Sequence, residues 1–181
     1  MPGDHSVWFR VEFAKLRNYI DFLRALAGGV ALLGIADGLD PTFSALPDAP
    51  EATAQLVSFV PLALLLLGVL IQTFRFEGRT RLFPPIFYFS GLSFAFGGVY
   101  VGVFALILIW AVNLVLPSPL AFLSLYALLV AVFGCVFDGF GLTPLFGAFL
   151  IFLPVLLSLL MRRPLVLFTK KVKPSGPVSS A

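Results

Sequence analysis

The fold of this chain is decided by residues 82–161, which read LFPPIFYFSGLSFAFGGVYVGVFALILIWAVNLVLPSPLAFLSLYALLVAVFGCVFDGFGLTPLFGAFLIFLPVLLSLLM. Asp138 is the one acidic or basic residue in this stretch, and Arg81 and Arg162 stand immediately outside its two ends. A water-soluble domain of this size would need many more charged side chains to face solvent. The stretch is therefore expected to lie in a lipid bilayer.

The composition of the whole chain agrees with this expectation. Of its 181 residues, 60% are hydrophobic and 12% are charged, and the mean hydropathy is +1.04, whereas an average soluble domain is about 25% charged. The first residues lack the basic region and apolar core of a cleaved signal peptide, so none is expected. The formal charge of +3 comes from basic residues that flank apolar segments. Phospholipid head groups, and not nucleic acid, are therefore the expected partner of these residues.

Apolar runs, separated by charged or proline-containing connections, predict an all-α fold. We expect a polytopic bundle of about five transmembrane helices, with four to six possible, in a single integral membrane domain over residues 1–181. The predicted membrane helices cover residues 25–39, 56–74, 86–116, 120–137 and 145–161. Residues 7–24 form an amphipathic segment that either lies at the head-group boundary or begins the first span. Residues 164–181 are expected to be a basic and then flexible tail.

The basic residues do not fit a simple orientation of five spans. The basic loop at 75–81 is expected on the inner side of the membrane, but five spans then place the basic residues of 162–173 outside. If residues 25–36 lie only at the interface, four spans remain and both termini are inside. The basic loop at 75–81 is then outside, against the positive-inside rule. A re-entrant segment at 86–98 would bring every basic cluster inside, but its backbone would need protein or water around it. Of these alternatives we favour five membrane helices, with the side of the carboxyl terminus left open.

Small residues line one face of the long predicted helix. Their spacings of 4, 3, 4 and 3 follow the helical period, which keeps them on one side. Such a face lets two membrane helices approach until their backbones pack. Either another helix of the same chain or a partner subunit can supply the second helix. The residues are Gly91, Ala95, Gly98, Gly102 and Ala105.

Two polar residues in the apolar half are candidates for ion or proton handling. Asp138 is followed by a glycine-containing turn, so a solvated or helix-capping carboxylate competes with a functional one. Asn113 is the clearest neutral polar group inside a span, and a hydrogen bond between helices competes with a functional role. One cysteine, Cys135, and one histidine, His5, provide neither a disulfide framework nor a metal site. No catalytic residue is predicted, because the hydroxyl groups of the membrane segments have no nearby base in the sequence to activate them.

These features favour a non-catalytic integral membrane subunit that packs through the small-residue face into a larger membrane protein assembly. The alternative is a small membrane transporter or channel. The expected partners are the lipid bilayer and other membrane protein subunits, and the expected location is a bacterial-type inner (plasma) membrane. No cofactor is expected within the chain, although the aromatic residues near the start of the long helix could contact an apolar lipid, quinone or pigment.

Overall fold

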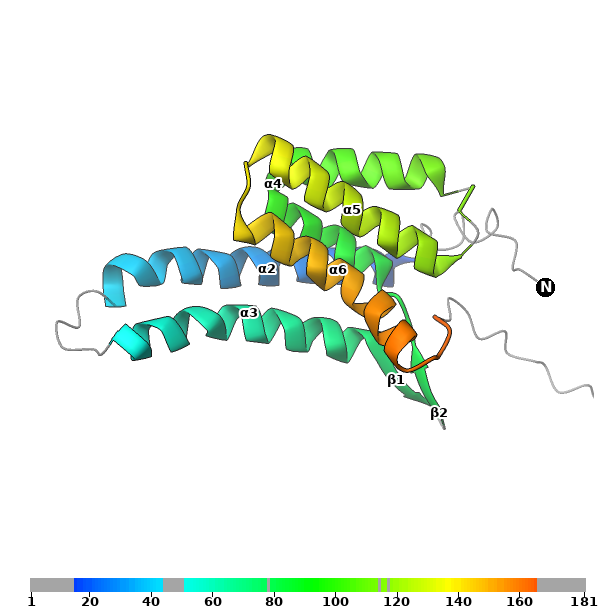
Figure 1. The fold of residues 1–181 in the computed structure, drawn as a ribbon, viewed down its shortest axis with the longest axis horizontal. Coiled ribbons are helices and arrows are strands. Elements are labelled where there is room, and N and C mark those ends of the chain that lie inside the picture. Colours follow the sequence, from blue (N-terminus) through cyan, green and yellow to red (C-terminus); the bar gives the residue numbers. More distant parts are fainter. Residues whose placement is uncertain (1–14, 44–50, 78, 114, 117, 166–181) are drawn as a thin grey trace, which may run out of the picture.

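The computed structural model describes residues 15–43, 51–77, 79–113, 115–116 and 118–165 (Figure 1). Within these ranges the chain forms five helices and one short pair of strands. The elements are α2 (Leu16–Phe43), α3 (Glu51–Thr73), β1 (Phe74–Glu77), β2 (Arg79–Leu82), α4 (Ile86–Val112), α5 (Pro119–Phe137) and α6 (Leu142–Leu160). The prediction of a helical fold is confirmed, whereas the strand pair was not predicted. Residues 7–14 of the predicted amphipathic segment, and the predicted tail after residue 165, lie outside the described residues.

Three of the described helices, α4, α5 and α6, are long and apolar enough to cross a membrane, judged by length and composition. In α3 the corresponding apolar part, Phe59–Thr73, is shorter. The predicted first span and the end of the amphipathic segment belong to one helix, α2. Asp21 and Arg24 of α2 form an ion pair at 3.0 Å, one turn apart. This pairing offsets two of the charges in the first half of α2.

The helix α4 is interrupted at Gly98. This residue has φ 65° and ψ −169°, a conformation that is essentially restricted to glycine. The rings of Phe87 and Trp110 have centroids 6.1 Å apart, although one continuous helix would hold these positions about 35 Å apart along its axis. The second half of α4, residues 99–112, therefore runs back beside the first half, residues 86–97, as Figure 1 shows.

This hairpin differs from the continuous helix expected over residues 86–116. Glycines on both sides of the break allow the two halves to touch. A Cβ atom added to Gly102 would overlap the ring of Phe94, and one added to Gly97 would lie 2.5 Å from the side chain of Val101. The physical reason for the difference is therefore local: glycine permits the turn, and the small neighbouring residues permit the close return.

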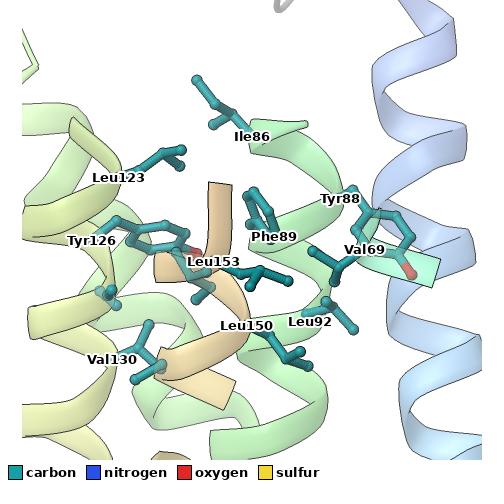
Figure 2. Close-up of a cluster of buried hydrophobic side chains, with 14 of the residues drawn as sticks. Val69, Ile86, Tyr88, Phe89, Leu92, Leu123, Tyr126, Val130, Leu150 and Leu153 are labelled. Atoms are coloured by element: carbon teal, nitrogen blue, oxygen red, sulfur yellow. The ribbon is translucent and has the colours of Figure 1, made fainter. Parts of the chain in front are cut away.

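The other helices pack around this hairpin. α2 and α3 form an antiparallel pair, and α2 packs along the first half of α4, while α5 contacts both α4 and α6. Buried side chains from α3, α4, α5 and α6 meet in the core, as Figure 2 shows. The largest fully buried side chains of this core include Tyr126, Phe89, Leu92, Leu123, Leu150 and Ile151.

A two-stranded antiparallel sheet connects α3 to α4. Its register places Phe74 opposite Leu82 and Arg75 opposite Arg81. Leu82 also forms a parallel β-bridge with Leu165, so the segment that follows α6 lies beside β2. Figure 1 shows this sheet at the same end of the bundle as the start of α2 and the end of α6. The break in α4 and the turn between α5 and α6 lie toward the opposite end.

Substituting Gly98→Ala should destabilise the protein by about 1–3 kcal/mol, because a side chain is strained in this backbone conformation. Thermal or denaturant unfolding of the protein in detergent micelles measures this loss. Val99→Ala is the matched control, since Val99 is exposed and truncation there should change stability by less than about 0.5 kcal/mol. Equal stability of Gly98→Ala and the unsubstituted protein would show that the break does not depend on glycine.

Candidate functional site

Two of the predicted small residues, Gly91 and Ala95, face α2 of the same chain. A Cβ atom added to Gly91 would overlap the carbonyl oxygen of Phe22 and lie 2.9 Å from the Cβ of Ala25. One turn further along, a Cβ atom added to Gly29 would lie 2.6 Å from the Cβ of Ala95. Two helices thus meet through small residues spaced four apart on each of them, which is a recurrent way to pack helices in lipid.

The remaining small residues point elsewhere. Gly102 lies under the ring of Phe94 within the α4 hairpin, and Ala105 is fully buried. Gly98 is exposed, and a Cβ atom added there would meet no atom within 4 Å. The five residues therefore do not form one continuous surface, because the break at Gly98 changes the direction of the helix that carries them.

Asp138 and Asn113 lie toward opposite ends of the bundle. Asp138 is the exposed C-cap of α5, and its backbone N–H donates to the carbonyl of Gly134 at 2.9 Å. Asn113 follows the second half of α4 and is 5% exposed; its Nδ2 is buried without a hydrogen-bond partner among the described residues. Since α5 runs antiparallel to that half, these two polar groups are not brought together. Among the residues that the structure describes, no group of three or more metal-ligating side chains occurs.

A buried hydroxyl cluster joins the first half of α4 to α5, and no pattern in the sequence pointed to it. Ser93 Oγ donates to the carbonyl oxygen of Ser90 at 2.8 Å. Because the Ser93 proton is used there, the Tyr126 hydroxyl donates to Ser93 Oγ, with 2.7 Å between the two oxygens. Ser90 Oγ donates to the carbonyl of Ile86 at 3.0 Å. These hydroxyl groups have hydrogen-bond partners within the chain, so they stabilise the packing of α4 against α5.

Aromatic rings cross the bundle near the open end of the hairpin. Successive ring pairs link α2, both halves of α4, and α5, with centroid distances from 5.6 to 6.3 Å. The rings in this row are Tyr19, Phe87, Trp110, Phe122 and Tyr126. They account for part of the aromatic cluster seen in the sequence by contacts inside the chain. Contact with an apolar lipid, quinone or pigment stays a prediction.

A well-defined turn closes α6 at the end of the bundle where the strands lie. The N–H of Arg163 donates to the carbonyl of Ser158 at 3.1 Å, and the N–H of Arg162 donates to that of Leu159 at 3.3 Å. These two bonds form a Schellman motif, in which glycine usually occupies the left-handed position. Here that position is taken by Arg162, with φ 49°. A left-handed arginine costs about 1 kcal/mol relative to glycine.

These features are compatible with a helical membrane protein. Its long helices are apolar enough to cross a bilayer, and the described hydroxyl groups near the centre of the bundle bond within the chain. A comparison with known proteins gives no match to a family model, a curated protein or a solved structure.

Substituting Gly91→Ala should loosen the contact between α2 and α4 and destabilise the protein by about 1–3 kcal/mol, because the new methyl group overlaps a backbone oxygen. Gly28→Ala in α2 is the control, since a Cβ atom added at Gly28 meets no atom within 4 Å. That change should be neutral or stabilise α2 by up to about 1 kcal/mol. Both are measured by unfolding in detergent, and equal effects would contradict the proposed role of Gly91.

Proposed function

We propose that this chain is a non-catalytic integral membrane subunit that crosses the bilayer four times and inserts α4 as a re-entrant hairpin. The crossing helices are α2, α3, α5 and α6. At 1.5 Å per residue the two halves of α4 are about 18 Å and about 21 Å long. A hydrocarbon core is about 30 Å thick, so neither half is long enough to cross it. The hairpin then begins and ends on the same side of the membrane.

The distribution of charge supports this topology. Four crossings place the start of α2, the β1–β2 sheet and the end of α6 on one side. The basic residues of these segments are Lys15, Arg17, Arg75, Arg79, Arg81, Arg162 and Arg163. On the other side are Asp138 and the connection from α2 to α3, where residues 40–55 contain three carboxylates and no basic residue. This distribution obeys the positive-inside rule, and it suits insertion into a bacterial-type inner membrane with the basic side in the cytoplasm.

The broken helix supports a role as a subunit. Where a helix breaks, the last carbonyls of one half and the first N–H groups of the next lack partners within the helix. Figure 1 shows this break toward the same end as the turn between α5 and α6, with α2 and α3 extending past both. Such groups are costly in hydrocarbon unless protein or water covers them. The exposed surface around Gly98, Val99 and Tyr100 is therefore where we expect a neighbouring subunit to pack.

The chemistry of the described residues favours this role over catalysis. The hydroxyl groups of Ser90, Ser93 and Tyr126 are used in packing, and Asp138 is the exposed C-cap of α5. An acid–base pair, which hydrolytic chemistry would need, is not assembled from these groups. A small transporter or channel is the second candidate, and the buried, unpartnered amide of Asn113 is the observation that favours it.

Extraction of native membranes with a mild detergent, followed by size separation and mass analysis, tests the subunit role. We expect the chain to elute in a complex well above its own 19.6 kDa, with at least one other polypeptide in fixed ratio. Val99→Trp should release the chain from this complex, because a bulky side chain at the break blocks close approach.

Ile107→Trp is the matched control, since Ile107 is similarly exposed on the same half of α4 but lies two turns from the break. It should leave the complex intact. Recovery of the unsubstituted chain as a lone monomer in mild detergent would contradict the proposal.

A further inference from the structure

Two basic segments that are far apart in the sequence meet at the strand-bearing end of the bundle. The parallel bridge between Leu82 and Leu165 holds the turn after α6 beside β2. That turn carries Arg162 and Arg163, and β2 carries Arg79 and Arg81. Arg162 is exposed. The backbone thus gathers several guanidinium-bearing positions in one place.

The sheet register pairs the backbone positions of Arg75 and Arg81. One feature of this cluster is unfavourable to the chain alone. Arg162 takes the left-handed position that glycine usually fills. The turn itself does not need an arginine there, because backbone groups and the Ser158 hydroxyl, which donates to the carbonyl of Arg163, close it. An exposed cation kept at this position, at a cost to the backbone, suits a role in binding an anion.

We propose that this end of the bundle binds the phosphate-bearing head group of an anionic phospholipid. Guanidinium groups bind phosphate through paired, charge-assisted hydrogen bonds. Leu159 and Leu160 are 59% and 71% exposed in the turn of α6 just before the arginines. They provide an apolar surface for the acyl chains next to the site for the head group. This neighbouring apolar surface favours a lipid over free phosphate.

This inference rests on the membrane insertion in the proposed function but not on the subunit role. The purified full chain in a neutral detergent is titrated with phosphatidylglycerol, with phosphatidylcholine of the same acyl chains, and with inorganic phosphate at matched ionic strength. Bound lipid is counted by native mass spectrometry, and thermal unfolding is followed in parallel. We expect saturable binding of phosphatidylglycerol with a rise in Tm, and neither effect with the other two. Equal binding of both lipids, or the same rise in Tm with phosphate, would overturn the proposal.

Arg162→Gly separates lipid binding from folding. Glycine suits the left-handed position, so the Tm without lipid should stay the same or rise. Affinity for phosphatidylglycerol should fall about fivefold, as expected for the loss of one cationic side chain near a head group. Arg17→Gln is the control, because Arg17 is an exposed cation in the first turn of α2, outside the cluster. It should change the affinity by less than about twofold. An equal loss of affinity in both variants would show that the lipid is held by the overall positive charge and would overturn the proposed binding site. A chain that needs no detergent to stay in solution would instead refute membrane insertion.

Discussion

The backbone at Gly98 turns through a left-handed, extended conformation, and the direction of every later helix follows from that turn. Without it, α4 would continue as one rod, and α5 and α6 would start from the opposite end of the molecule. With it, the two halves of α4 return to the same end and form the centre around which α2, α5 and α6 pack. The conformation of the single residue Gly98 therefore sets the topology of the whole helical bundle.

Close contact between small and large residues holds this arrangement in place. Glycine at positions 29, 91 and 102 lets backbone or rings come within van der Waals distance. Lipid tails are as apolar as the side chains, so the hydrophobic effect contributes little to helix association inside a bilayer. Dispersion contacts at these glycines and the hydrogen bond between Ser93 and Tyr126 must therefore supply much of the specificity. Aromatic rings then fill the wider spaces between the helices.

Much of the helical content could be predicted from hydropathy, because long uncharged runs have few alternatives in a membrane. The predicted span 120–137 agrees with α5 (Pro119–Phe137), and 145–161 overlaps most of α6 (Leu142–Leu160). The break in α4 at Gly98 was not part of the favoured prediction of five membrane helices, although the re-entrant alternative ended at residue 98. Glycine alone did not decide between the two, since it is also common in unbroken membrane helices. The assumption of a continuous helical period then assigned Gly91 and Gly102 to one face, although they meet different neighbours. The strand pair was missed because each strand has only four residues. Phe74–Glu77 does alternate apolar and polar residues, but a run of this length is the shortest that gives a strand signal, and its arginines were interpreted as a basic loop.

The candidate sites were harder to predict, since they depend on contacts between distant segments. Ser93 and Tyr126 are 33 positions apart, and the bridge between Leu82 and Leu165 joins the two ends of the apolar half. Neither contact leaves a periodic pattern in the sequence. The position of Asp138 could be predicted from local sequence, because a carboxylate directly before a glycine-containing turn is expected at a helix end. In the structure Asp138 is the C-cap of α5.

Thiol labelling in sealed, oriented membrane vesicles tests the re-entrant hairpin most directly. In a Cys135→Ser background, single cysteines replace Thr80 in β2, Val115 after α4, and Phe140 between α5 and α6. A membrane-impermeant reagent should label positions 80 and 115 from the same side and position 140 from the other. Labelling of position 115 from the side opposite to position 80 would mean that α4 crosses the bilayer, which would contradict the re-entrant hairpin and the four-crossing topology built on it.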